Sequence, residues 1–167
     1  MHTIKRFLPL LLLILFFTHA NAQEEKFGLT WYTDINKVNE LSSKQKKPIF
    51  AFFTGSDWCG WCHKLEKDVF VKPGFQAWAK KNVILLEVDF PKTKQLPEKL
   101  AKQNNDLAGF FQVQGYPTIW IFNMNKDKTT GKFSITQFGS LGYPRCEQGK
   151  EEATFLENLE TIMKNKS

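Results

Sequence analysis

The residues with the clearest chemical potential are Cys59, Gly60, Trp61, Cys62 and His63, which follow one another along the chain. Two cysteines separated by two residues form redox-active disulfides, and the same spacing followed by a histidine also attaches haem covalently. If the stretch opens a helix, Cys59 and Cys62 lie on the same face about one turn apart, so their sulfurs can close a small ring. The compartment and the surrounding elements decide between the two chemistries.

Residues 1–22 have the features of a cleavable secretory signal. Lys5 and Arg6 precede an apolar run over residues 7–17, and Ala20 and Ala22 supply the small side chains that a signal peptidase requires. The run is shorter than the roughly 20 residues of a membrane-spanning helix. We therefore expect a mature chain, residues 23–167, that is periplasmic or secreted and does not span the membrane.

The mature chain has the length of one domain, since single domains most often contain about 100 to 150 residues. The formal net charge of +6 falls to +4 without Lys5 and Arg6, because residues 1–22 contain no acidic side chain. The lysines are scattered, which argues against a nucleic-acid partner. We expect a monomer with one cysteine pair and one further cysteine, Cys146, to which we give no catalytic role.

Other uses of the cysteine motif lack the partners that they need. A c-type haem requires His63 as an axial ligand and usually a second ligand, and the mature chain offers only Met124 and Met163 for that role. A zinc site lacks a second ligand pair. A purely structural disulfide of this spacing removes little unfolded-state entropy. A binding module with such a disulfide, and a haem protein, remain the alternatives to a redox site, for which we expect no metal and no cofactor.

The pattern of apolar residues predicts alternating strands and helices. Residues 49–54 form an unbroken apolar run, typical of a strand buried on both faces of a sheet. The expected strands are 28–32, 49–54, 83–89, 118–122 and 132–138, and the expected helices are 35–46, 58–70, 75–81, 96–111 and 151–163. This order predicts an α/β fold whose central mixed sheet is parallel in its crossovers, antiparallel at the final hairpin and covered by helices on both faces.

The position of each cysteine in its helix predicts a different role. The expected helix follows a central strand, and a site is typical at the carboxyl end of such a strand. Cys59 falls in the first turn, where unpaired N–H groups and the helix dipole stabilise a thiolate. Cys62 lies deeper and should keep an ordinary or raised pKa. We expect Cys59 to attack a substrate disulfide and Cys62 to resolve the mixed disulfide.

Three separated segments together resemble the thioredoxin fold family. They are the strand PIFAFF, the motif WCGWC that opens a helix, and GYPT at residues 115–118, and the resemblance covers roughly residues 26–164. It implies that Pro117 is cis and lies opposite the disulfide, and that Gly115 and Tyr116 help to bind an extended substrate peptide. It also implies that Trp58 shelters the thiolate.

The chain departs from the family in two places. Thioredoxins have a buried aspartate in the strand before the dithiol, and an alignment with one inserted residue puts Phe52 there. Asp57 is the nearest acid in sequence, and we expect it to cap the active-site helix. Trp61 replaces the usual proline between the cysteines, which leaves the reduction potential open.

The sequence therefore predicts an exported thiol-disulfide oxidoreductase with a Cys-Gly-Trp-Cys active site. Its substrates are expected to be exported proteins with disulfides or thiols, and its turnover requires a redox partner that the sequence does not identify. Between the two directions of electron flow, we favour that of a reductase.

Overall fold

A six-stranded mixed sheet in the order β1-β2-β4-β3-β5-β6 forms the centre of the computed structural model, which describes residues 23–127 and 129–164. The predicted signal, residues 1–22, lies outside the described residues. The strands are β1 (Gln23–Lys26), β2 (Leu29–Tyr32), β3 (Ile49–Thr54), β4 (Ile84–Asp89), β5 (Thr118–Lys126) and β6 (Phe133–Leu141). The helices are α1 (Ile35–Gln45), α2 (Gly60–Leu65), the π-helical turn η1 (Glu66–Phe70), α3 (Pro73–Asn82), α4 (Glu98–Phe110) and α5 (Glu151–Lys164).

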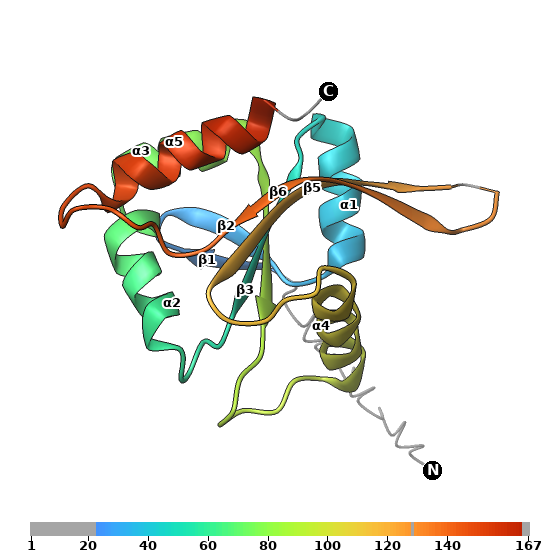
Figure 1. Cartoon of the computed structure of the whole chain (residues 1–167). Coiled ribbons are helices and arrows are strands. Elements are labelled where there is room, and N and C mark those ends of the chain that lie inside the picture. Colours follow the sequence, from blue (N-terminus) through green and yellow to red (C-terminus); the bar gives the residue numbers. More distant parts are fainter. Residues whose placement is uncertain (1–22, 128, 165–167) are drawn as a thin grey trace, which may run out of the picture.

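Helices cover both faces of the sheet, as the sequence predicts. Figure 1 shows α2, α3 and α5 on one side and α1 and α4 on the other. Along β3 the side chains alternate between two cores: Phe50 and Phe52 pack under α2, η1, α3 and α5, while Phe53 packs with α1 and α4. All six residues of β3 are buried, which confirms the prediction of a strand covered on both faces.

The strand pairing explains why distant segments meet at one end of β3. Strands β3 and β4 are parallel, and β5 and β6 form the predicted antiparallel hairpin. The prediction of parallel crossovers is wrong for the connection through α4, because β5 runs antiparallel to β3, with Thr118 opposite Phe53. The chain therefore returns to the carboxyl end of β3 before β5 begins, which brings the residues before Thr118 to the end of the sheet where Cys59 lies.

Strand β1 is absent from the sequence-based prediction. It is a charged, largely exposed edge strand, and it pairs with β2 through a tight turn in which Phe27 and Gly28 both have positive φ, 56° and 65°. In sequences, a two-residue turn with positive φ at both positions is usually recognised by the dipeptide Asn-Gly or Asp-Gly. Here a phenylalanine occupies the first position, so the usual signal is missing.

Candidate active site

The two motif cysteines form a disulfide at the start of α2, with an S–S distance of 2.11 Å and a Cα–Cα distance of 5.2 Å. Cys59 is the N-cap of α2, and its Sγ accepts a hydrogen bond from the backbone N–H of Cys62 at 3.2 Å. Cys59 retains 5% exposure, whereas Cys62 is fully buried. Of the two cysteines, only Cys59 presents any surface to an incoming group.

Trp58 immediately precedes Cys59, and its indole is held on several sides. Its Nε1 donates a hydrogen bond to the carbonyl oxygen of Phe90 at 2.8 Å, and its ring meets Tyr116 edge-on at 5.8 Å between centroids. A Cβ built on Gly55 would lie only 2.4 Å from the indole, so a glycine is required beneath it. Trp58 nevertheless keeps 39% exposure. It can therefore contact a bound peptide while remaining fixed in position.

The second predicted segment, residues 115–118, lies against Trp58. The Tyr116-Pro117 bond is cis, as the resemblance implies. The Tyr116 ring packs between Trp58 and Phe90, whose ring centroid is 5.4 Å away. We call Trp58, Phe90 and Tyr116 the aromatic wall. Burial raises the pKa of the Tyr116 phenol above its usual value.

Asp57 does not cap the active-site helix, and that prediction is wrong. The helix begins at Gly60, so the cap position falls on Cys59. The Asp57 carboxylate turns to the segment after β4, where it accepts hydrogen bonds from the backbone N–H groups of Lys92 and Thr93 and from the Thr93 hydroxyl. The Thr93 hydroxyl and these backbone N–H groups lower the pKa of Asp57 to about 2.

A second carboxylate ties the same two segments together. Asp89, buried at the end of β4, accepts hydrogen bonds from the backbone N–H of Ser56 at 2.8 Å and from its hydroxyl at 2.6 Å. Asn104 donates to the Asp89 carbonyl oxygen at 2.9 Å. The loop that carries Trp58 and Cys59 is thus fastened to the end of the neighbouring strand. The polar Ser56 and Asp57 before the motif were the only sequence signal of this contact.

A second aromatic contact flanks the cysteines through Trp61. This side chain has 59% exposure and packs against Tyr143, with ring centroids 5.2 Å apart. The Tyr143 hydroxyl donates to Asp68 at 2.7 Å, and Asp68 also pairs with Lys64. Tyr143 was not among the predicted site residues, because it lies more than 80 positions from the motif and no periodic pattern connects the two.

A buried acid does exist near the motif, but on a different strand from the one expected. Glu87 of β4 is directly in register with Phe52 of β3, so both side chains lie on the sheet face that α2 covers. Its side chain is 7% exposed, and each carboxylate oxygen accepts a hydrogen bond from Lys26 Nζ at 2.9 Å. Burial raises the pKa of Glu87, against the opposing effect of Lys26. The signal was available, since Glu87 alone is charged in the apolar run of residues 83–88.

Two further residues are His63 and Cys146, whose side chains do not contact the disulfide or the aromatic wall in any described interaction. His63 is exposed, and its Nε2 lies 2.9 Å from the Ser56 carbonyl oxygen. Cys146 is an exposed free thiol in the segment between β6 and α5. Within residues 23–127 and 129–164, no cluster of three or more His, Cys, Asp or Glu side chains could hold a metal ion, and no helix is long and apolar enough to cross a membrane.

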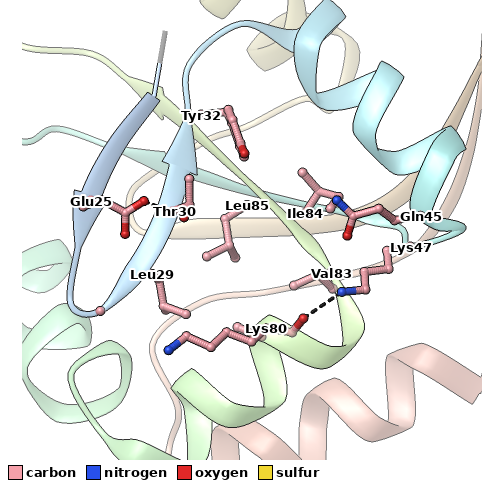
Figure 2. Close-up of a pocket in the computed structure, with 12 residues that line it drawn as sticks. Glu25, Leu29, Thr30, Tyr32, Gln45, Lys47, Lys80, Val83, Ile84 and Leu85 are labelled. Carbon is pink, nitrogen blue, oxygen red and sulfur yellow. Dashed lines mark hydrogen bonds between the residues drawn. The ribbon is translucent and has the colours of Figure 1, made fainter. Parts of the chain in front are cut away.

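A separate pocket of about 400 Å³ lies at the opposite end of the sheet (Figure 2). Strands β2 and β4 pair only through Trp31 with Leu85 and Tyr32 with Leu86, so they diverge toward the start of β4 and leave this space. Lys47 Nζ closes one side by donating to the carbonyl oxygen of Lys80 at 2.7 Å. None of its lining residues belongs to the disulfide site.

Comparisons of sequence and of structure both match this chain to thioredoxin-like proteins. The model of a thioredoxin-like domain family matches residues 36–141. The disulfide bond reductase DsbH of Chlamydia pneumoniae is 33% identical over 124 residues, which are 74% of this chain and 69% of that protein. A solved structure described as DsbH oxidoreductase superposes with a TM-score of 0.67 at 27% identity, covering 88% of this chain and 90% of the other.

A thioredoxin from Thermus thermophilus shares the fold alone, with a TM-score of 0.53 at 16% identity over 80% of this chain and 85% of that chain. The family match spans β3, the disulfide, the cis proline and the hairpin, which are the elements that build the site. The chain therefore belongs to the thioredoxin-like domain family.

Proposed function

We propose that this chain is an exported protein-disulfide reductase that works through Cys59 and Cys62. The observation that carries the proposal is the buried Cys59–Cys62 disulfide at the carboxyl end of a central strand, with only the first cysteine accessible. The similarity to a protein named disulfide bond reductase supports the activity and its direction. The predicted signal in residues 1–22 supports export to the periplasm or beyond the cell.

The reaction is a thiol-disulfide exchange in two steps. In the reduced protein, the Cys59 thiolate attacks a substrate disulfide, forms a mixed disulfide and expels the first substrate thiolate. The Cys62 thiolate then attacks Cys59 Sγ, which restores the internal disulfide and expels the second substrate thiolate. The substrate gains two electrons, and the two protons lost by the cysteines go to the released thiolates. A dithiol redox partner must then reduce the Cys59–Cys62 bond.

The position of Cys59 supports its role as the attacking group. At the N-cap of α2, its sulfur faces the backbone N–H of Cys62, and such a group stabilises a thiolate more than a thiol. Cys62 is buried in the core with Phe52 and Leu65, which disfavours its charged form. Cys59 is accordingly the better placed of the two to act as the attacking thiolate.

Substrate peptides would dock at the residues around the cis proline. The ring of Tyr116 contacts Trp58 and the Tyr116-Pro117 bond is cis, and we expect an extended peptide to add as a strand along Gly115, Tyr116 and Pro117. Because Trp58 and Trp61 are both exposed beside the disulfide, they can cover the mixed disulfide during the reaction.

Cysteine variants of the mature protein test the mechanism. Cys59→Ser should abolish reduction of a model disulfide protein, while Cys62→Ser should accumulate mixed disulfides that a gel without reductant displays. Cys146→Ser serves as the control and should turn over like the wild type. Full activity in Cys59→Ser would refute the mechanism, and absence of turnover in the wild type would favour a binding module with a structural disulfide.

The reduction potential tests the direction of electron flow. Equilibration of the mature protein against glutathione buffers should give a value near or below about −230 mV for a reductase. A value between about −120 and −180 mV would instead indicate a disulfide donor or an isomerase. Sequencing the N-terminus of protein recovered from the periplasm of a bacterial host tests export, and it should begin at Gln23.

A further inference from the structure

One lysine lies directly on the aromatic wall beside the disulfide. Lys92 Nζ is 3.9 Å from the ring centroid of Trp58, the residue immediately before Cys59. Lys92 is exposed, and within the described parts of the chain no carboxylate forms an ion pair with its ammonium group. A positive charge therefore lies over the ring of the residue that immediately precedes the attacking cysteine.

The position of this lysine is fixed by contacts that do not involve its own charge. Its backbone N–H donates to the two Asp57 carboxylate oxygens at 3.0 and 3.1 Å, and the next residue, Thr93, donates its N–H to Asp57 at 2.7 Å. In Figure 1 the segment between β4 and α4 passes beside the segment between β3 and α2 at the lower edge of the molecule. Because the backbone is tethered, less conformational entropy is lost when the ammonium group meets a ligand.

The carboxylates nearby are occupied by other donors. Asp57 is turned to the backbone of Lys92 and Thr93, as described above. Asp89 is buried and bonded to Ser56, and Lys94 Nζ reaches it at 3.2 Å. Lys92 is thus the cation of this segment whose ammonium group has no carboxylate partner among the described residues, and the mature chain, whose formal net charge is +4 without Lys5 and Arg6, is already cationic. The complementary partner is an anionic side chain.

The structure also leaves room for a peptide that runs along this wall. A hollow of about 450 Å³ adjoins the wall at Phe90, and its apolar lining is Phe90, Pro91, Leu96 and Ala101. Its other lining residues are polar or charged and include both Lys94 and Glu98. Phe90 belongs to both the hollow and the aromatic wall, since its ring contacts Tyr116. A peptide held at the cis proline can therefore extend along Phe90 toward this hollow, and Lys92 lies two residues after Phe90 with its ammonium group over Trp58.

We propose that Lys92 is a specificity-determining residue that favours substrates with an acidic side chain close to the disulfide attacked by Cys59. The inference rests on the proposed function, and it specifies in addition that the preferred substrates are acidic near the disulfide. An exposed ion pair stabilises a complex modestly, so the expected preference for an acidic over a neutral substrate is about two- to fivefold in rate at low ionic strength. The preference should disappear in high salt, which screens exposed charges.

Three peptides that differ in one type of residue test the proposal. Each carries a single cysteine in a disulfide with thionitrobenzoate, whose release is coloured, and has Glu, Gln or Lys two positions to either side of that cysteine. Single-turnover rates are measured with the reduced mature protein, so no redox partner is required. The wild type should react fastest with the Glu peptide and slowest with the Lys peptide.

Two lysine variants separate a local effect from the overall charge. In Lys92→Gln the ratio of the Glu to the Gln peptide rates should fall to about 1, and in Lys92→Glu the order should reverse. Lys99→Gln removes the same charge from an exposed position on α4 and should leave the ratio as in the wild type. An equal ratio in wild type and Lys92→Gln would overturn the inference while leaving the reductase intact, whereas a wild type inert toward all three peptides would refute the proposed function itself.

Discussion

Removing the lysine partner of the buried Glu87 carboxylate should destabilise the protein in a pH-dependent way. At an effective dielectric constant of about 20, two charges 2.9 Å apart attract by about 6 kcal/mol, which offsets the cost of burying the carboxylate. In Lys26→Met the carboxylate loses this compensation but can take up a proton instead. At pH 7 neutralising a group with a usual pKa of 4.5 costs about 3.4 kcal/mol, since each pKa unit corresponds to about 1.36 kcal/mol.

Lys26→Met should therefore lower the free energy of unfolding by about 3 kcal/mol at pH 7. At pH 5, where protonating the Glu87 carboxylate costs only about 0.7 kcal/mol, it should lower it by less than about 1 kcal/mol. The direction of this pH dependence follows from the burial of Glu87, which raises its pKa. The folded variant therefore binds a proton at Glu87 more tightly than the unfolded chain does, and its free energy of unfolding increases as the pH falls. In the double variant with Glu87→Met, no charge is left buried, and stability should return to near that of the wild type.

Urea unfolding of the oxidised mature protein at pH 5 and pH 7 measures these differences. With a slope of about 2 kcal/mol per molar urea, the midpoint of Lys26→Met should lie about 1.5 M below that of the wild type at pH 7. Lys37→Met, which removes an exposed lysine paired with Glu40 on α1, is the matched control and should shift the midpoint little. An equal loss at both pH values, or a double variant as unstable as Lys26→Met alone, would refute the reasoning.

Three further predictions concern the loops around the disulfide. The pKa of Asp57 is lowered to about 2, so its contribution to stability is complete above about pH 4 and is lost as the pH falls toward 2; the difference in unfolding free energy between wild type and Asp57→Asn should shrink over that range. Gly55→Ala places a Cβ 2.4 Å from the Trp58 indole and should cost about 1–3 kcal/mol, with a shift in tryptophan emission that an unmoved indole would not give. Tyr143→Phe removes the hydrogen bond to Asp68 and should cost about 1 kcal/mol by urea unfolding; an unchanged midpoint would show that the bond contributes nothing.

The elements that the sequence predicted well are those with a strong local pattern. The apolar run of residues 49–54 and the helical spacing after Cys59 depend on neighbouring residues only, and both appear in the fold, although α2 begins at Gly60, two residues later than expected. The cis bond at Pro117 was expected from the resemblance carried by GYPT rather than from any periodicity, and it is present. By contrast, the polar strand β1 has no apolar alternation, so its pairing with β2 was missed.

Within the site, the sequence by itself determined the reacting pair, because two cysteines three positions apart at a helix start must meet whatever surrounds them. Only the tertiary structure decided which groups support that pair. Asp57 finds its partner 35 positions along the chain, and Lys26 finds Glu87 61 positions away. Contacts of this range follow from the order of the strands in the sheet, in which β4 lies between β3 and the antiparallel pair of β1 and β2. Local propensity carries no information about them, since it describes a residue and its near neighbours, whereas the energy of a buried charge depends on the side chain that packing brings to it.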